Sequence, residues 1–344
     1  MTIYIGPGAT GSGVAEIMGL LNGVNYPKVI GVRTLIVKII AVVLAVVGSL
    51  CVGKEGPLAH IGTVTTILTI YMPIDGFKFF QNDHDKRTFI AAGAAAGVSA
   101  AFGSPIGGAL FAYEISKPTT FWTFGMLWLV FITSAISTLT LAILTSMYKG
   151  TVTSLSSAAV LKFGTLTQLY SPMADLPAAL LIGAVCGVLG AIFVDVQGRL
   201  GKIRKKYITT NSKKIFEVCV FSFATAATFF FVAMSSSNCA KKAPFEVREL
   251  YEFQCPDGYY SPLATLLFNT EGGTIRSIMD YELKLTFYDS AMFTFVWYFF
   301  FVTTYGVWVP SGLFLPGIII GCGLGQLYGQ LFDELFPTAV PETD

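Results

Sequence analysis

Long uncharged runs separated by short polar segments dominate the chain. A helix needs about 20 apolar residues to span the hydrocarbon of a bilayer. The last of these runs, 290–332, is too long for one helix, and the segment 309–312 (Val-Pro-Ser-Gly) divides it. Because open sheet edges cannot remain in lipid, we predict helices throughout, with about six to eight segments entering the membrane. The runs are 57–74, 88–113, 121–148, 176–194, 218–240 and 290–332, together with 34–52, which only Lys38 interrupts.

The composition supports a membrane location for these helices. Of the 344 residues, 53% are hydrophobic and only 12% are charged, about half the charged share of an ordinary soluble domain, and the mean hydropathy is +0.66. Lysine and arginine number 22 against 21 acidic residues, so the net charge is +1 and nucleic-acid binding is disfavoured. The sequence therefore predicts an all-α polytopic membrane protein, with residues 1–344 forming a single transmembrane domain.

Two groups of glycines indicate close packing between helices. Gly183, Gly187 and Gly190 fall near one helical face, and 321, 325 and 329 repeat every four residues. Small residues at such spacings let helix backbones touch. This pattern is typical of polytopic bundles and implies no particular function.

Charge in the loops predicts the orientation of the chain. The segment 199–214 holds seven basic residues and no acid, which places it in the cytoplasm. One apolar crossing later, the mildly acidic segment 239–284 should face outward or into a lumen. It contains Cys239 and Cys255, which would form a disulfide there or remain two free thiols; both alternatives stay open.

Glycine and proline interrupt the apolar pattern beside three helices. The interruptions are 11–16 (GSGVAE), 53–57 (GKEGP) and 312–316 (GLFLP), and each is typical of a loop that opens a helix. A helix N-terminus presents free N–H groups and about half a positive charge, so it attracts anions. Several such ends meeting inside the membrane would bind an anion without a full positive charge.

Glu55 is the first candidate for a functional side chain. It follows the apolar run 34–52, where an ionised carboxylate costs about 2.5–3.5 kcal/mol at the bilayer centre. Helix N–H groups would stabilise its anionic form in the position of a bound anion, and protonation would release it. Glu55 would then act as both gate and proton carrier. The alternative is that Glu55 pairs with Lys54 or caps the helix.

An enzymatic interpretation is weaker. Residues 48–54 fit G-x-x-x-x-G-K, but Glu55 stands where a phosphate-binding loop needs serine or threonine. His60 and His84 are the only histidines, and no Cys/His spacing indicates a metal site. We therefore expect neither an enzyme nor a cofactor or metal.

The three interruptions resemble elements of the CLC family of chloride channels and chloride/proton exchangers. Residues 11–16 resemble its GSGIPE element, 53–57 its GK/REGP element and 312–316 its GxFxP element, in the family's order and at similar spacing. The segment 86–103 and the outward loop with two cysteines resemble especially the eukaryotic endosomal and lysosomal exchanger branch. The resemblance covers essentially the whole chain.

This resemblance implies specific roles. Ser12 and Gly13, with the backbone N–H groups of Leu313 and Phe314, would bind chloride, and Glu55 would be the gating and proton glutamate. Serine rather than proline at position 12 favours chloride over nitrate. Members of the family are homodimers with a pore in each subunit, built from inverted repeats.

Three departures qualify the resemblance. Exchangers carry an inner proton glutamate as the second of two adjacent acids, but here Glu114 is followed by Ile115, an aliphatic residue typical of the family's channels. Glu114 would substitute for that acid or be a buried structural acid. Ala15 replaces a proline of the first element. The chain also lacks an early helix, the last membrane helices and the cytoplasmic CBS pair of the family, so it is expected to be truncated at both ends.

The function predicted is selective chloride transport, by a voltage- or pH-gated channel or by a chloride/proton antiporter. The alternative is a truncated, non-conducting subunit that dimerises with a complete CLC partner and regulates it. The expected setting is an endosomal, lysosomal or other intracellular membrane, with membrane lipid, a second copy and an accessory subunit as partners and no nucleic acid.

Overall fold

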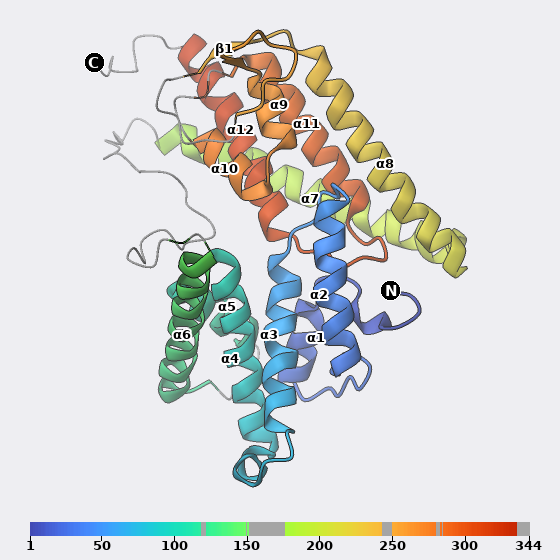
Figure 1. Cartoon of the computed structure of the whole chain (residues 1–344), viewed down its shortest axis with the longest axis vertical. Helices are drawn as coiled ribbons and strands as arrows, with labels where there is room; N and C mark the ends of the chain where they lie inside the picture. The colour runs from blue at the N-terminus through green and yellow to red at the C-terminus, as the bar shows by residue number, and fades with distance from the viewer. Residues whose placement is uncertain are drawn as a thin grey trace. The chain divides into compact units, whose positions relative to one another are not determined.

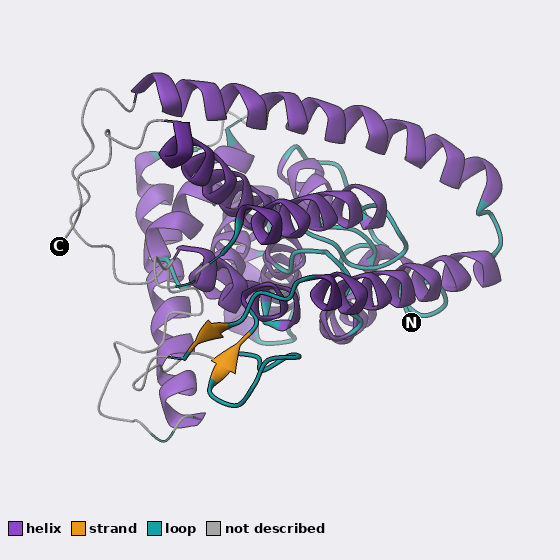
Figure 2. Ribbon diagram, turned by 90° about the horizontal axis from the view of Figure 1, so that it is seen from above, coloured by secondary structure: helices purple, strands orange, loops and turns teal. Residues whose placement is uncertain are grey.

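The computed structural model describes residues 1–117, 122–148, 150, 176–242, 250–279, 283 and 285–335. Helices make up nearly all of its regular structure, and the strands are confined to one short pair (Figures 1 and 2). The predicted all-α fold is therefore confirmed. Packing divides the chain into two units. The first comprises 1–48, 52–161 and 306–315, and the second comprises 49–51, 162–305 and 316–344.

The first unit consists of six α-helices in close contact. Its 3₁₀ turns are η1 (Pro7–Ala9) and η2 (Asp75–Phe80). Helix α3 packs chiefly against α4, and α4 also packs against α5 and α6 (Figure 1). The helices are α1 (Val14–Leu21), α2 (Val32–Val47), α3 (Glu55–Ile70), α4 (Asp83–Phe102), α5 (Pro105–Ser116) and α6 (Phe124–Tyr148).

Glycines bring α3 and α4 into backbone contact. A Cβ added to Gly62 would lie 2.2 Å from the carbonyl oxygen of Gly93, and one added to Gly97 would lie 2.2 Å from that of Leu58. Only a residue without a side chain fits at either position. Alanines from α4 and α5 fill the surrounding core, which suits helices that approach this closely.

The second unit is also helical. Its strands β1 (Ala240–Lys241) and β2 (Tyr259–Tyr260) pair antiparallel, and Figure 2 shows them as the two short arrows. Helix α11 packs against α7, α8 and α9. The helices are α7 (Leu176–Tyr207), α8 (Asn211–Ser235), α9 (Pro262–Phe268), α10 (Glu271–Met279), α11 (Phe287–Thr304) and α12 (Phe314–Leu335). The first two residues of α12 belong to the first unit.

Cys239 and Cys255 form a disulfide beside the strand pair, with their Cα atoms 5.8 Å apart. The buried carboxylate of Asp289 holds the neighbouring end of α8. It accepts hydrogen bonds from Ser236 Oγ at 2.6 Å and Asn238 Nδ2 at 3.0 Å, and it forms the capping box of α11 with Thr286. The disulfide and this network together anchor the connection that follows α8.

Four helices in the described part of the chain are long and apolar enough to cross a membrane. These are α6, α7, α8 and the Phe314–Phe332 portion of α12. Helices α2 and α3 have 16 residues each. At about 1.5 Å per residue they fall short of the roughly 30 Å hydrocarbon thickness. About half of the exposed large hydrophobic residues lie on α6, α7, α8 and α12, and α2 carries a further group, as expected for surfaces that face lipid.

The prediction of close packing at the glycines of α7 and α12 was wrong within this chain. A Cβ added at any of those six positions would meet no atom of the described residues within 4 Å. The glycine spacing shows which helical face is small, but it does not show whether another helix covers that face. The closely packed glycines of the structure lie instead on α3 and α4.

Candidate anion-binding site

Two glycine loops far apart in sequence are joined by backbone hydrogen bonds. The amide of Gly53 donates to the carbonyl of Gly312 at 3.0 Å, and the amide of Gly312 donates to the carbonyl of Gly53 at 2.7 Å. A Cβ at Gly312 would lie 2.8 Å from the Gly53 oxygen, so the approach depends on glycine. This bridge places the beginnings of α3 and α12 side by side.

The third loop joins the same group. The Gly11 amide donates to the carbonyl of Val309 at 3.0 Å. Ser12 packs directly on the first turn of α3, because a Cβ added to Gly56 would lie 2.1 Å from Ser12 Oγ. Gly13, with a φ of 87°, takes the left-handed conformation that lets α1 begin at Val14. All three predicted helix starts therefore meet.

Glu55 lies where these starts meet. It is the first residue of α3, and its side chain is fully buried. Oε2 accepts a hydrogen bond from the Leu315 amide at 3.4 Å. Oε1 has no hydrogen-bond partner within the described residues. The carboxylate thus occupies a position at the start of α12 where backbone N–H groups favour an anion.

The beginning of α12 supplies the remaining polar groups. Leu313 precedes the helix, Phe314 is its first residue, and both are partly exposed. Sequence reasoning named these two amides and missed that of Leu315, which contacts Glu55. It also missed Ser311, whose buried hydroxyl has no hydrogen-bond partner among the described residues.

One aromatic contact flanks the site. The rings of Phe111 on α5 and Phe314 meet edge to face, with their centroids 5.7 Å apart. This pair could not be predicted from the sequence, because residues more than 200 positions apart share no local pattern. The contact fixes the side of the α12 start that faces α5.

The two residues at the predicted inner proton position point in different directions. Ile115 is buried in the apolar core of the first unit. Glu114 is exposed on this chain, and its carboxylate lies 3.8 Å from Lys117 Nζ. The alternative that Glu114 is a buried structural acid is therefore wrong. Adjacent helix positions point about 100° apart, so the side chain of Glu114 points in a different direction from that of Ile115.

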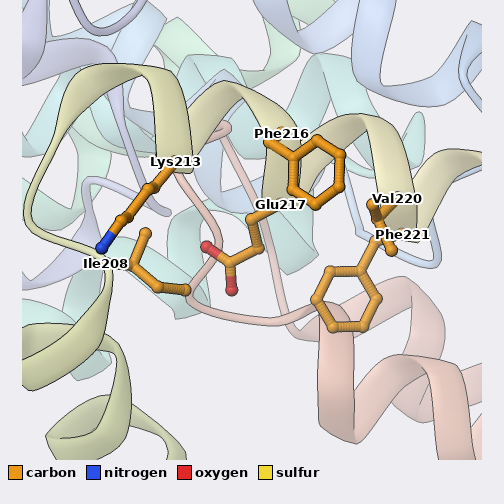
Figure 3. A pocket seen from close by; sticks show the side chains of 6 residues that line it. All are labelled: Ile208, Lys213, Phe216, Glu217, Val220 and Phe221. Carbon is orange, nitrogen blue, oxygen red and sulfur yellow. The ribbon is translucent and has the colours of Figure 1, made fainter.

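No cluster of metal-binding side chains occurs among the described residues. A surface hollow of about 320 Å³ lies in the second unit, along the first turns of α8, and shares no residue with the helix starts. Figure 3 shows the Glu217 carboxylate between Ile208 and Phe221 in this hollow. Its lining is mainly apolar, so it is a poor site for a small anion.

Comparison with known proteins shows the family of this chain. The family model described as "Voltage gated chloride channel" matches residues 1–343. The chain belongs to the CLC family. The resemblance read from the three interruptions is thereby confirmed, and so is the CLC-type architecture.

Characterised relatives agree with this assignment. The chain is 36% identical to "H(+)/Cl(-) exchange transporter 7" of Bos taurus over 98% of this chain and 43% of that protein. It is 33% identical to "Chloride channel protein C" of Dictyostelium discoideum over 98% of this chain and 46% of that protein. The chain thus spans less than half the length of these relatives, whose names are those of transporters and channels rather than enzymes.

A solved structure, "Crystal Structure of a eukaryotic CLC transporter", matches with a TM-score of 0.64. The match covers 98% of this chain and 50% of that one, at 22% sequence identity. At that identity it supports the fold.

Proposed function

We propose that this chain forms the anion-conducting part of a CLC protein that carries chloride across a membrane. The single observation that carries the proposal is the meeting of three helix starts around the buried carboxylate of Glu55. Ser12 and Gly13 approach from α1, and the amides of Leu313 and Phe314 approach from α12. Chloride is the anion in the names of both relatives, and it suits a site built from N–H and O–H donors alone.

Glu55 is proposed as the gate. Its carboxylate bonds to the start of α12 in the position that a transported anion would take. Protonation removes the negative charge and with it the attraction to the helix N–H groups. The side chain would then leave, and chloride would enter. Transport should accordingly rise as the pH on the side that reaches Glu55 falls.

Whether chloride transport is coupled to protons depends on the residues at the predicted inner proton position, Glu114 and Ile115. The exchanger named among the relatives supports coupled transport. The burial of Ile115 in an apolar core and the outward position of Glu114 favour passive flow instead, because neither residue offers a buried acid. We give passive, Glu55-gated flow the first place and exchange the second.

The same relatives support a proposal for the membrane in which the protein lies and for its orientation there. Likeness to the exchanger relative favours an endosomal or lysosomal membrane, and the family resemblance implies a homodimer with one pore in each chain. The basic end of α7 would then face the cytoplasm, and the Cys239–Cys255 disulfide would face the lumen, where oxidising conditions preserve it. An accessory subunit stays a prediction.

The test is a flux measurement in liposomes with the protein in its longest natural form. A chloride gradient is imposed, and chloride efflux and proton uptake are recorded together. We expect chloride efflux that rises in acid, with little proton movement. The variant Glu55→Ala should pass chloride at all pH values. Absence of chloride flux would contradict the proposal, and uphill proton movement would assign exchange in place of passive flow.

A further inference from the structure

A buried lysine–histidine pair lies beside the helix starts and has no part in the function proposed above. Lys38 Nζ on α2 lies 2.7 Å from His60 Nδ1 on α3. Lys38 is 1% exposed and His60 is fully buried. Lysine is almost never buried so completely without a partner, so this contact requires an explanation.

Lys38 faces the core. The buried residues of α2 are Thr34, Val37, Lys38, Ala41 and Ala45, which recur at the spacing of a single helical face. That face packs toward α3, so the ammonium group cannot reach solvent by extending along its own helix. The charged residues on the neighbouring elements are Glu16 in the first turn of α1, Lys54, which caps α3, and Glu55, which begins it.

The ring of His60 packs against Gly13, one of the glycines of the anion site. A Cβ added to Gly13 would lie 2.5 Å from the Cγ atom of the His60 ring. The same α3 helix holds Gly56 against Ser12 one turn earlier, since residues four apart lie on one face. The imidazole ring is therefore packed directly behind the turn that presents Ser12.

The contact restricts the protonation of the pair. If both groups were cations, each would have only N–H donors, and two charges would repel each other in a medium of low dielectric. If both groups were neutral, the pair would carry no positive charge. With one shared proton, the lysine ammonium donates to Nδ1 and the imidazole carries its own hydrogen on Nε2. Nε2 has no partner among the described residues.

We propose that Lys38 and His60 hold one excess proton between them and thereby fix a single positive charge behind the Ser12 turn. The proposal rests on the proposed function, because it makes this pair a positioning device for the same anion site. His60 acts through Lys38: it accepts the ammonium hydrogen bond that keeps the buried lysine charged. The charge attracts chloride toward the helix starts without contacting the ion, so release remains easy.

The state of the pair is tested by nuclear magnetic resonance on ¹⁵N-histidine-labelled protein in lipid nanodiscs. The sequence has two histidines, and His84 is exposed, so His84→Gln leaves a single histidine signal. We expect that signal to show a neutral imidazole with hydrogen on Nε2 throughout about pH 5–8, whereas an ordinary histidine titrates in this range. Lys38→Met should change the tautomer balance of His60. A positively charged His60 near neutral pH, or a signal that Lys38→Met leaves unaltered, would overturn the shared proton.

The role of the charge is tested by chloride titration calorimetry on the same protein. Removing a unit charge within roughly 10 Å, at an effective dielectric of about 20, should weaken chloride binding about tenfold. Lys38→Met should show this loss and Lys38→Arg should not. His60→Leu, which removes the acceptor, should behave like Lys38→Met.

His60→Asn is the matched control, because its amide oxygen lies near the position of Nδ1 and still accepts from Lys38. We expect it to bind chloride within about threefold of the unaltered protein. Equal losses in His60→Asn and His60→Leu, or unchanged affinity in Lys38→Met, would overturn the role. Absence of chloride binding in the unaltered protein would instead contradict the proposed function, and the histidine signal would still decide the state of the pair.

Discussion

Replacing Gly56 by alanine perturbs the candidate site at its closest contact. The added methyl group would lie 2.1 Å from Ser12 Oγ, whereas ordinary van der Waals contact begins near 3.4 Å. The serine hydroxyl must therefore retreat by more than about 1 Å, or the two helix starts must separate by that amount. Either movement breaks a hydrogen bond from Ser12 to an anion, because such bonds tolerate only a few tenths of an ångström.

The expected magnitude follows from that bond. A hydrogen bond to a charged group contributes about 1.5–3 kcal/mol, so Gly56→Ala should weaken chloride binding about tenfold to hundredfold. Overpacking should also destabilise the fold by about 1–3 kcal/mol, less up to about 1 kcal/mol that alanine gains over glycine in a helix.

Gly317→Ala supplies the control for this prediction. Gly317 lies in the first turn of α12, and a Cβ there would meet no atom of the described part of the chain within 4 Å. That variant should keep its chloride affinity and unfold at the same or a slightly higher temperature. The assay is chloride titration calorimetry with thermal unfolding measured with and without chloride. Chloride binding by Gly56→Ala within twofold of the unaltered protein would refute the placement of Ser12 at the site.

Three further predictions concern other parts of the chain. Ser12→Pro should shift the flux preference from chloride toward nitrate, and an unaltered flux ratio in liposomes would argue against Ser12 as a ligand. Arg204 donates to Glu217 at 2.6 Å, and the two side chains are only 11% and 9% exposed, so Arg204→Met should lose about 3–5 kcal/mol of stability in thermal unfolding, while Arg199→Met at an exposed pair should lose under about 1 kcal/mol. Equal losses would contradict this assignment. Cys239→Ser opens a loop with a sequence separation of 16 and should cost about 3 kcal/mol, measured by unfolding without reductant; an unchanged midpoint would show that the bridge does not stabilise the protein.

The helix starts could be predicted from the sequence because their signals are local. Glycine and proline act on the dihedral angles of their own and adjacent residues. The segments 11–16, 53–57 and 312–316 therefore each predicted a loop followed by a helix. The structure begins α1, α3 and α12 within these segments. The family resemblance then related the three segments to one another, which local pattern alone could not do.

Contacts across the chain could not be predicted in the same way. The bond from Leu315 to Glu55 and the pairing of Lys38 with His60 depend on how helices distant in sequence are packed. Lys38 appeared in the sequence only as an interruption of an apolar run. Its burial results from the packing of α2 against α3.

The most direct test of the central claim is anomalous X-ray diffraction from crystals of the protein grown in bromide, which replaces chloride. We predict an anomalous peak within hydrogen-bond distance of Ser12 Oγ and of backbone amides at the start of α12, with the Glu55 carboxylate beside it or displaced. A well-ordered structure with bromide peaks elsewhere and none at these helix starts would contradict the account.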